Sequence, residues 1–512
     1  MDFACLDEHL RAAAQGTPDA PAYTYLGKTV SYSELYHDVL CVAGGLQELG
    51  LASGDGLAIL LPNGPEFVTA FHGALRAGMY CVPMNPLYPP GELLYMIRDS
   101  GVKAIVAPLQ LAAMAPLVRA AVPGIALIVV EQSGALPDGV VPYGSLLAHA
   151  PVADARRATG SVDDLAVVLY TSGTTGKPKG AMLTHGNLSS EAVILGDYMD
   201  YAAEDRIVAV LPLFHAFGLT VCLNTAIYTG AELIILPRFS PTEVLTVIQA
   251  ARATIFVGVP TMYSFILQAA RDTAVDVSSV RHWVSGGAAM PTAVMESFER
   301  RFGAPILEGY GLSEASPVTS FAPMDGRPRK IGSIGVTLPM MEQMVVDEED
   351  RAAPVGELGE LVVRGPNVMK GYLGRPEETA AILRGGWLHT GDIARMDEDG
   401  YFYIVDRKKD MIIVGGFNVY PREVEDVLFG HEGLIESAVV GVPDDQYGEA
   451  VVAYVVRRND SLTAEDIQAF CAERLVKYKW PTRIVFTDEL PKNAIGKVLR
   501  RQLKELSAHS PS

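Results

Sequence analysis

The residues best suited to chemistry lie in one segment, Tyr170 to Asn187, with the sequence YTSGTTGKPKGAMLTHGN. We expect a buried strand to end at Tyr170 and to run into a loop of Ser, Thr and Gly that carries Lys177 and Lys179. Converging backbone N–H groups, hydroxyl donors and lysine charge together suit a polyphosphate. The loop is not a Walker A loop, because Pro178 stands where that loop has Ser or Thr. A surface linker is the alternative, but Asn187 is expected to cap a following helix.

Bulk composition narrows the classes of function. The chain has 512 residues, which at roughly 150 per domain predicts about three compact units. Hydrophobic residues make up 49% and charged residues 20%, so a large core is expected and disorder is not. The formal net charge is −19, with no block of lysines or arginines, which argues against a nucleic-acid partner. Anionic small molecules stay compatible, because a few local cations and N–H groups can hold them.

The cysteines and the N-terminus indicate the compartment. The five cysteines are scattered without C-x-x-C spacing, so neither a disulfide framework nor a zinc site is expected. The opening residues, MDFACLDEHL, lack the basic and apolar regions of a signal peptide. The stretch 207–231 lacks Asp, Glu, Lys and Arg, but Pro212 and Gly218 interrupt it, which favours a buried strand, loop and helix over a membrane span. We expect a cytoplasmic protein with no integral membrane segment.

Apolar runs alternate with helical segments from about residue 55 to 310. This alternation predicts a doubly wound α/β architecture, with two such units in tandem. Continuous apolar runs are typical of parallel strands buried on both faces. The expected strands are 57–61, 165–170, 207–211, 232–236 and 254–257, and the expected helices are 240–252 and 290–302.

The pattern changes after residue 325, where short strands are separated by Gly, Pro and Asp. This predicts a β-rich subdomain with strands at 356–365 and 398–406. A last α+β unit follows, with strands near 435–442 and 449–457 and a helix near 463–476. We therefore expect an N-terminal domain, 1–405, built from α/β subdomains (1–325) and a β-rich subdomain (326–405), and a small C-terminal domain, 406–512.

Further motifs follow the Ser/Thr/Gly loop in order. They are SGGAAMP at 285–291, EGYGLSE at 308–314, HTGD at 389–392, YFYIVDRKKDMIIVGGFNVYP at 401–421 and PKNAIGKVLRR at 491–501. Each is moderately specific alone, but their ordered conjunction is very specific. Together they resemble the adenylate-forming superfamily: acyl-CoA synthetases, peptide-synthetase adenylation domains and beetle luciferases. The resemblance covers nearly the whole chain, with Ser313 standing where threonine is commoner.

The resemblance implies that the chain binds ATP and Mg²⁺. The Asp392 carboxylate can accept hydrogen bonds from both ribose hydroxyls, and the Tyr310 ring offers a flat face to adenine. Glu314 supplies the hard oxygen that Mg²⁺ prefers. The residues implied for ATP or AMP are Thr171, Ser172, Gly173, Thr174, Thr175, Gly176, Lys179, Gly287, Ala288, Ala289, Glu308, Gly309, Tyr310, Gly311, Leu312, Ser313, Asp392, Ile404, Arg407, Asn418 and Lys497.

The resemblance also implies the catalytic groups Lys497, Glu314 and His215. Lys497 matches the lysine that bridges the substrate carboxylate and the α-phosphate while an acyl-adenylate forms. Negative charge grows on phosphorus as the carboxylate attacks, and removing comparable charge stabilisation costs about 10²–10³-fold in rate.

The acyl acceptor is expected to be CoA. The segment 406–421 looks most like that of bacterial medium- and long-chain fatty-acyl-CoA synthetases. In that family the C-terminal domain rotates at a hinge, here Asp406, and a segment matching Gly415 and Gly416 then faces the pantetheine channel. Small residues would let a thin chain slide past the backbone. Arg238 stands where relatives place a basic residue near CoA, although a solvated arginine is a close alternative.

The acid is expected to be hydrophobic. Amino-acid-activating relatives place an aspartate near 211–218, where this chain has LPLFHAFG and no carboxylate. His215 resembles an aromatic residue at the pocket mouth, with a packed core histidine as the alternative. An aliphatic or aryl tail would be held by area burial at about 25 cal/mol per Å². The pocket residues implied are His215, Trp283, Ser285, Gly286, Gly309 and Val318.

Other interpretations of the function stay open from the sequence. The chain could be a stand-alone adenylation enzyme that loads a carrier protein, or an aryl-CoA ligase. A non-catalytic nucleotide-binding protein is disfavoured, because Lys497, Glu314 and Asp392 are all present. A carrier protein and a second copy of the chain are the partners left open, beside the carboxylic acid, ATP and CoA.

Overall fold

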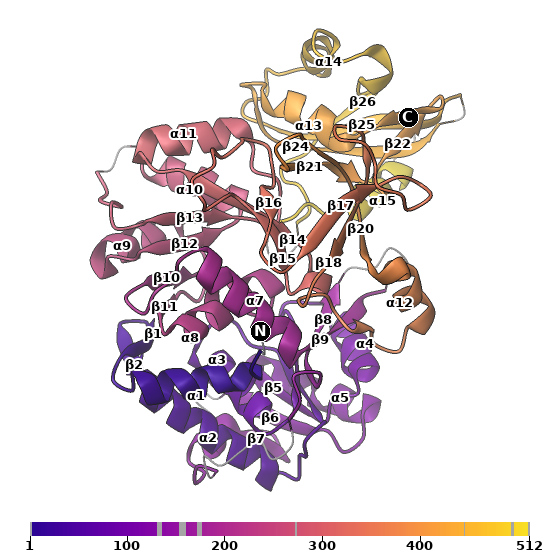
Figure 1. Ribbon diagram of the computed structural model, residues 1–512. Helices are drawn as coiled ribbons and strands as arrows, with labels where there is room; N and C mark the ends of the chain where they lie inside the picture. Colours follow the sequence, from indigo (N-terminus) through magenta and orange to yellow (C-terminus); the bar gives the residue numbers. More distant parts are fainter. Residues whose placement is uncertain are drawn as a thin grey trace.

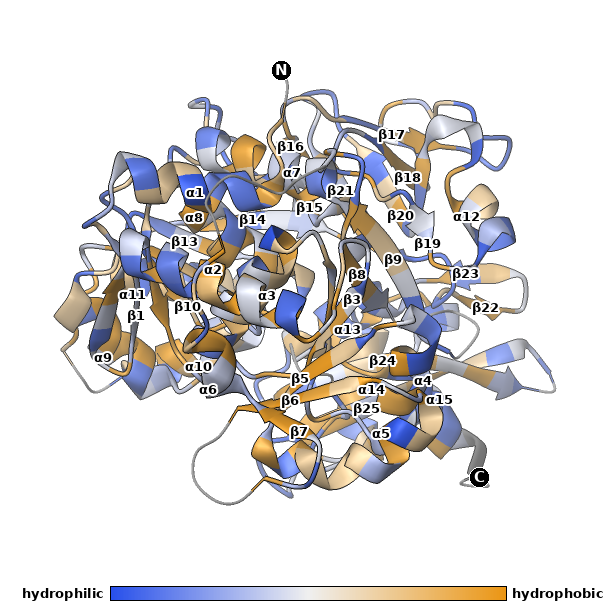
Figure 2. Cartoon of the chain, turned by 90° about the horizontal axis from the view of Figure 1, so that it is seen from below, coloured by the Kyte–Doolittle hydropathy of each residue, from blue (hydrophilic) through white to orange (hydrophobic). Residues whose placement is uncertain are grey.

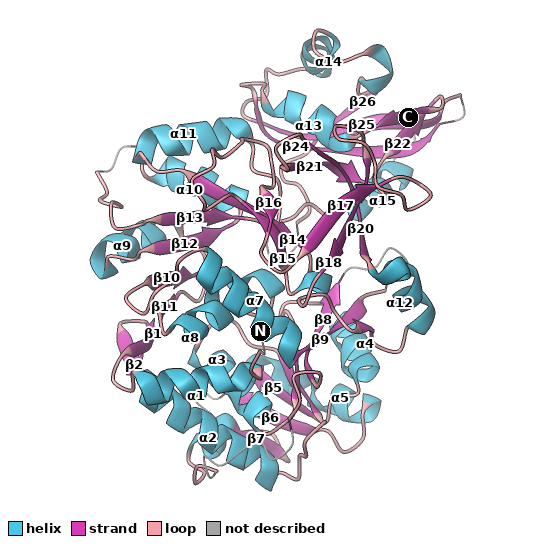
Figure 3. Ribbon diagram, viewed as in Figure 1, coloured by secondary structure: helices cyan, strands magenta, loops and turns pink. Residues whose placement is uncertain are grey.

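The computed structural model describes residues 3–130, 136–152, 160–171, 177–271, 274–444, 446–492 and 496–509. Two α/β layers form the large lower body in Figure 1, and the C-terminal unit lies above them. Helices and strands alternate through the lower body, as Figure 3 shows. The expected fold class, a large α/β domain with a small C-terminal α+β domain, is confirmed.

The first sheet has eight strands. The five pairings from β8 to β7 are parallel, whereas β9 runs antiparallel to both β8 and β19. Their apolar runs are buried, and in Figure 2 strands β5 and β6 are mostly orange. In order across the sheet the strands are β19 (Gly371–Tyr372), β9 (Lys179–Thr184), β8 (Leu165–Thr171), β4 (Tyr80–Pro83), β3 (Gly56–Ile59), β5 (Ala104–Pro108), β6 (Ala126–Val130) and β7 (Val140–Pro142).

The second sheet has nine strands. Strands β14 to β1 pair in parallel, and antiparallel strands close both edges. In order the strands are β16 (Val336–Thr337), β15 (Val318–Phe321), β14 (Ile306–Gly311), β13 (His282–Ser285), β12 (Ile255–Gly258), β10 (Arg206–Ala209), β11 (Glu232–Ile235), β1 (Pro21–Tyr25) and β2 (Lys28–Ser31).

The two sheets are interleaved along the chain. Strands β1 and β2 precede the whole first sheet yet extend the second, and β19 comes from the expected β-rich region yet extends the first. The apolar runs alone did not predict these crossings. Parallel sheets need cover on both faces and at their edges, which distant short segments supply here.

Helices pack on the faces of both sheets. Prolines at their first positions start α3, α4, α9, α10 and α12, as a fixed φ and a missing N–H allow. The helices of the large body are α1 (Leu6–Gly16), α2 (Tyr32–Glu48), α3 (Pro65–Arg76), α4 (Pro90–Ser100), α5 (Ala115–Ala121), α6 (Tyr143–Leu147), α7 (His185–Tyr198), α8 (Thr225–Thr229), α9 (Pro241–Ala251), α10 (Pro260–Ala269), α11 (Thr292–Phe302) and α12 (Pro376–Ile382), with short helical turns at Leu109–Met114, Gly218–Asn224, Ser313–Ala315 and Arg384–Gly386.

The start of α7 corrects one expectation. Thr184, not Asn187, is the N-cap: its side chain accepts a hydrogen bond from the Asn187 backbone amide. The Asn187 side chain returns a hydrogen bond by accepting from the Thr184 amide at 2.9 Å. Because β9 runs on to Thr184, the cap falls at the strand end and Asn187 completes a capping box.

Two smaller sheets complete the chain. The four-stranded sheet contains β17 (Glu342–Val346), β18 (Gly359–Arg364), β20 (Leu388–Met396) and β21 (Phe402–Arg407). The C-terminal sheet contains β23 (Phe417–Val419), β22 (Ile412–Val414), β25 (Gly448–Arg457), β24 (Leu434–Asp444) and β26 (Arg483–Phe486), with α13 (Pro421–Phe429), α14 (Ala464–Ala472), a turn at Lys477–Lys479 and α15 (Arg500–His509). The expected boundary at Asp406 falls one residue before the end of β21.

Candidate functional site

A carboxylate held between three strands forms the centre of the site. Asp392 in β20 lies opposite Arg407 in β21, and Arg407 Nε is 3.2 Å from Asp392 Oδ1. The Tyr310 hydroxyl of β14 donates a hydrogen bond to Asp392 Oδ2. Burial raises the pKa of Tyr310 well above its ordinary value, so the phenol keeps its proton. The two Asp392 oxygens therefore have fixed directions, suited to accepting hydrogen bonds from adjacent hydroxyl groups.

Lys497 approaches this carboxylate from the C-terminal unit. A Cβ on the neighbouring Gly496 would lie 3.2 Å from Thr261 Oγ1 of α10, so this loop touches the large body. Burial first, and then the charge of Arg407, lower the pKa of Lys497 to about 7, while Asp392 raises it. Lys497 thus lies within electrostatic range of both charged groups. The fold thus brings Lys497 close to Asp392 and Arg407, from which it is distant in the sequence.

His215 shares this space with Lys497. Its Nδ1 accepts a hydrogen bond from the Phe217 amide at 3.2 Å, which leaves the ring proton on Nε2. Burial and, after it, the charge of Lys497 lower the pKa of His215 to about 4. The imidazole is therefore neutral near pH 7 and can offer an N–H without adding positive charge beside the lysine.

Glu314 lies in the turn after β14. Its Oε1 accepts hydrogen bonds from the Tyr372 hydroxyl at 2.7 Å and from the Thr171 hydroxyl at 3.4 Å. Thr171 is the last residue of β8 and leads into the Ser/Thr/Gly loop, so the carboxylate stands at the base of that loop. A carboxylate and hydroxyl oxygens are the donor type that suits Mg²⁺.

Lys179 lies at the other end of the same loop, in β9. Its ammonium pairs with the Glu378 carboxylate and lies 5.3 Å from the centre of the Tyr372 ring. The loop residues between Thr171 and Lys179 that were expected to hold phosphate, Ser172, Gly173, Thr174, Thr175 and Gly176, lie outside the described residues.

The loop between β13 and α11 carries the residues expected against adenine. Gly287 has φ +78°, which glycine adopts without strain. Glu308 Oε1 accepts a hydrogen bond from the Met290 amide at 3.2 Å and so holds the far end of this loop. Burial raises the pKa of Glu308 to about 7. Other expected neighbours lie around this loop or at the end of β14: Ala288, Ala289, Gly309, Gly311, Leu312 and Ser313.

Around the expected acyl pocket, the backbone at Gly286 and Gly309 lies close to aromatic side chains. A Cβ on Gly286 would lie 3.0 Å from the Phe217 ring and 3.2 Å from the Gly309 carbonyl. A Cβ on Gly309 would lie 2.7 Å from the Phe321 ring. Space next to these backbones is thus taken by aromatic side chains, so a side chain at either glycine would collide with a ring. Ser285 and Val318 are buried beside them in β13 and β15.

The position of Trp283 differs from the expectation that it lines the pocket. Its ring is fully buried among aromatic rings and lies 4.9 Å from Phe298 and 5.4 Å from Phe256. Side chains alternate across a strand, and this one points into the layer under α10 and α11. We therefore assign Trp283 to the core.

The residues expected to meet CoA are two glycines of the C-terminal unit and Arg238 of the large body. Gly415 (φ +57°) and Gly416 (φ +87°) form the two-residue turn between β22 and β23, where both positions need positive φ. Asn418, which is expected to bind ATP or AMP, is exposed in β23. Its neighbour Phe417 is also exposed and stacks on Tyr478 with ring centres 4.7 Å apart. Arg238 is exposed on the connection between β11 and α9.

Asp406 joins the large body to the C-terminal unit. Its Oδ2 accepts a hydrogen bond from the Arg422 amide at 2.9 Å, at the N-terminus of α13. Burial raises the pKa of Asp406, while this hydrogen bond and the charge of Arg500 lower it. The carbonyl of Ile404, two residues earlier, accepts from Arg422 Nη1 at 2.9 Å. This junction is therefore tied to the first turn of α13.

Sequence reasoning missed the residues that position the expected ligands. Tyr372, which donates to Glu314, lies 58 residues further along the chain. Thr390 Oγ1 accepts from the Asp392 amide at 3.1 Å and donates to the Leu361 carbonyl at 2.7 Å. Thr390 belongs to the HTGD motif and could have been found there, whereas no spacing links Tyr372 to Glu314.

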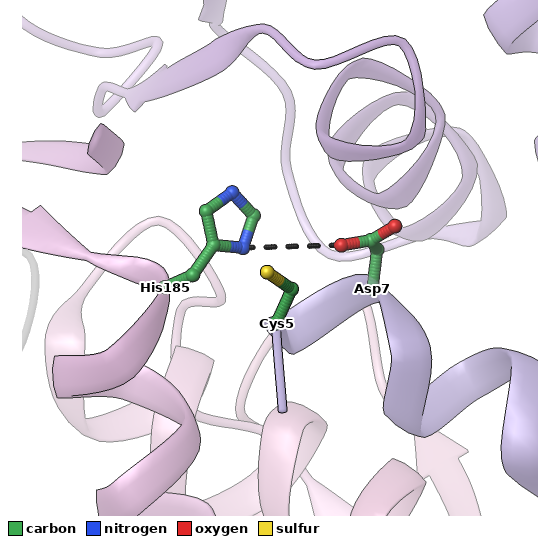
Figure 4. Close-up of side chains that lie close together, drawn as sticks. All are labelled: Cys5, Asp7 and His185. Atoms are coloured by element: carbon green, nitrogen blue, oxygen red, sulfur yellow. Dashed lines mark ion pairs between the residues drawn. The ribbon is translucent and has the colours of Figure 1, made fainter. Parts of the chain in front are cut away.

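A second group of chemically active side chains lies near the N-terminus. Cys5, Asp7 and His185 converge between α1 and α7, and one ligand atom from each lies within 4.8 Å of the others (Figure 4). His185 Nδ1, however, accepts a hydrogen bond from the Leu6 amide at 3.2 Å. Asp7 Oδ2 pairs with buried Arg76 at 3.2 Å. Through these contacts His185 and Asp7 hold α1 against α7 and α3. We therefore interpret this cluster as structural.

Among the described residues, no helix has both the length and the apolar character needed to cross a bilayer.

Comparison with known families gives two matches. A model described as AMP-binding enzyme matches residues 10–373, and a model described as AMP-binding enzyme C-terminal domain matches residues 423–497.

Similar proteins match over nearly their whole length. A long-chain-fatty-acid–CoA ligase of Bacillus subtilis is 40% identical over 536 residues, covering 98% of this chain and 94% of that protein. A feruloyl-CoA synthase of an Amycolatopsis species is 38% identical over 496 residues, covering 96% of each.

Similar solved structures bear on the domain arrangement. The ATP-bound structure of MatB from Rhodopseudomonas palustris is 35% identical, covers 99% of each chain and superposes with a TM-score of 0.92. The apo structure of the same protein superposes with a TM-score of 0.78. The arrangement described here is thus more similar to the ATP-bound form.

Proposed function

The chain belongs to the AMP-binding enzyme family, and from this premise we propose that it is an AMP-forming acyl-CoA synthetase for a hydrophobic carboxylic acid. A medium- or long-chain fatty acid is the first candidate substrate. The observation that carries the proposal is the meeting of Lys497, Asp392, Arg407 and His215 at one site. ATP and CoA are the co-substrates of this family.

In the first half-reaction a carboxylate oxygen of the acid bonds to the α-phosphorus of ATP. The bond from that phosphorus to the bridging oxygen breaks, and pyrophosphate leaves. Protonated Lys497 stabilises the negative charge that grows on the α-phosphate. Its pKa of about 7 would rise when the anionic nucleotide binds, because an opposite charge nearby favours the ammonium. Neutral His215 orients the acid without repelling the lysine.

The nucleotide is held by groups with fixed directions. The Asp392 oxygens accept hydrogen bonds from the ribose hydroxyls, and the loop at Gly287 packs against the adenine together with Tyr310. Mg²⁺ fits the oxygen donors at Glu314 and would neutralise phosphate charge when bound. Thr171 and Lys179 hold the two ends of the phosphate loop.

In the second half-reaction the CoA sulfur bonds to the acyl carbon and AMP leaves. The Gly415–Gly416 turn belongs to the same unit as Lys497 but is exposed in the present arrangement. We therefore infer that the unit rotates between the steps, with Asp406 as the hinge, since hinges are a few residues at the end of an element. Arg238 would then meet a phosphate of CoA.

The substrate class rests on the pocket and on the relatives. Gly286, Gly309, Val318 and the rings of Phe217 and Phe321 offer apolar contact and no carboxylate for an amino group. Fatty-acid-activating relatives favour an aliphatic acid, which would place the enzyme in cytoplasmic lipid metabolism. The feruloyl-CoA synthase keeps an aryl acid as the second candidate. Transfer to a carrier protein is the alternative second step.

A panel of carboxylic acids tests the proposal. Fatty acids of increasing length, ferulate-like aryl acids and amino acids are each supplied with ATP and Mg²⁺, with and without CoA. We expect pyrophosphate release with hydrophobic acids and acyl-CoA, identified by mass, only when CoA is present. Pyrophosphate release without any acyl-CoA would move the proposal to a carrier protein, and no release with any acid would refute it.

A further inference from the structure

A buried carboxyl that the reaction does not use lies on α7. Glu191 has an exposed fraction of 0%, and its Oε1 accepts a hydrogen bond from the Val318 amide at 2.9 Å. Burial raises its pKa well above the ordinary value. Among the described residues, Glu191 takes part in no ion pair, so a neutral acid is the form with the lower desolvation cost.

Asn367 holds the same turn from the other side. This side chain is fully buried and its Nδ2 donates to the carbonyls of Ala315 at 2.6 Å and Val318 at 3.1 Å. The Ser316 hydroxyl donates to the Asn367 carbonyl at 2.8 Å. Asn367 also lies within hydrogen-bonding reach of the Glu191 carboxyl. One amide therefore fixes both ends of the turn that follows Glu314.

Asn187, four residues before Glu191 on the same face of α7, extends this arrangement. Its Nδ2 donates to the carbonyls of Pro366 at 2.7 Å and Val368 at 2.9 Å. The amide of the next residue, Met369, donates to the Glu314 carbonyl at 2.8 Å. The face of α7 thus reaches the Glu314 backbone through the segment 366–369.

The turn needs such support. Ser316 has φ +70°, a conformation that non-glycine residues rarely adopt. Backbone of this kind persists when the surrounding contacts over-determine it. In addition, Glu191 Oε2 and Asn367 Oδ1 are buried and find no hydrogen-bond partner among the described residues. A proton on Glu191 Oε2 would supply a donor for Asn367 Oδ1.

We propose that Glu191 is a positioning residue: as a neutral buried acid it joins Val318 and Asn367 and so fixes the turn that aims the Glu314 carboxylate. The proposal rests on the proposed role of Glu314 at Mg²⁺ and ATP. Glu191 touches neither substrate nor metal; it acts through the 315–318 backbone. Supporting residues of this kind typically change metal affinity or activity about 10–100-fold when removed.

Three variants on α7 test the proposal. Glu191→Ala removes the acceptor and the proton, whereas Glu191→Gln keeps an acceptor and replaces the O–H donor by an N–H donor. Ser190→Ala is the matched control, because Ser190 is also buried but donates to the carbonyl of Asn187 within its own helix, at 2.9 Å. Each variant is measured for ATP-dependent Mn²⁺ binding by electron paramagnetic resonance and for the Mg²⁺ concentration at half-maximal pyrophosphate release.

We expect Glu191→Ala to weaken Mn²⁺ binding and to raise the half-saturating Mg²⁺ concentration about 10–100-fold. Glu191→Gln should stay within about threefold of the parent, and Ser190→Ala should match it. Parent-like Mn²⁺ binding in Glu191→Ala, or equal loss in the Ala and Gln variants, would overturn the proposal. If the parent released no pyrophosphate with any acid, the proposed function would fail, but the Mn²⁺ series would still decide the role of Glu191.

Discussion

Two loops of the C-terminal unit are in opposite situations. The loop with Gly496 and Lys497 contacts the large body at Thr261 and lies within range of Asp392. The Gly415–Gly416 turn is exposed, and a Cβ on Gly416 would meet no atom of the described residues within 4 Å. The C-terminal unit therefore places its Lys497 loop near Asp392, while its Gly415–Gly416 turn stays exposed.

Under the proposed function, this difference would let one domain serve two half-reactions. Under the proposed function, positive charge is useful where phosphorus gains negative charge, and Lys497 would supply it. A narrow turn without side chains is useful where a thiol must reach an acyl carbon, and we propose that the two glycines serve there. Because both loops cannot occupy one small site together, the proposed function needs a separate arrangement of the unit for each half-reaction.

The largest expected effect is on Lys497. We expect Lys497→Ala to reduce pyrophosphate release from acid and ATP by at least about 10²–10³-fold. The same variant, supplied with a preformed acyl-adenylate, should make acyl-CoA at close to the parent rate. Both half-reactions are followed by rapid quench and mass spectrometry. Equal losses in both halves would mean that the lysine has a structural role and that the two loops are not divided by step.

The second-largest effect is expected at Gly416, where a bulky side chain should impair the second half-reaction instead of the first. Gly416→Trp should leave pyrophosphate release nearly intact and reduce thioester formation about 100-fold, because bulk enters the thiol path only after rotation. The control is Gly416→Ala, which has the same positive-φ strain, about 1–2 kcal/mol, without the bulk. Acyl-CoA production by the Trp variant at the rate of the Ala variant would show that this turn does not line the path.

The smallest expected effect is the dependence on pH. The pKa of Lys497 is lowered to about 7, so its protonated fraction falls as pH rises through 7. At subsaturating ATP, kcat/KM of the first half-reaction should fall toward a tenfold loss per pH unit above that value, because kcat/KM reports the free enzyme. Thioester formation from supplied acyl-adenylate should lack this decrease, which is the alkaline limb of the pH profile.

Two variants identify the titrating group in that profile. Lys497→Arg should remove the limb, because the guanidinium stays charged. Burial raises the pKa of Glu308 to about 7, so this carboxyl titrates in the same window. Persistence of the limb in Lys497→Arg together with its loss in Glu308→Gln would assign it to Glu308 instead.

The regular part of the fold follows from the sequence. Apolar runs such as 165–170 and 232–236 became strands β8 and β11, and a proline near the start of 240–252 marks α9, because burial on both faces and a fixed φ are local properties of the residues. The motif residues Tyr310, Asp392 and Arg407 were also identified from the sequence. The exchange of edge strands between the two sheets was not, since pairing of distant segments leaves no periodic signal.

The sequence by itself determined the kinds of groups available: a lysine near the end of the chain, a carboxylate in HTGD, and glycines where the backbone must turn. Only the tertiary structure decided which of them meet. It placed Lys497 near His215 and lowered both pKa values, buried Trp283 in the core, and set Glu191 against the Val318 amide. The physical reason is that burial, desolvation and long-range hydrogen bonds depend on neighbours in space, which residue types and spacing do not specify.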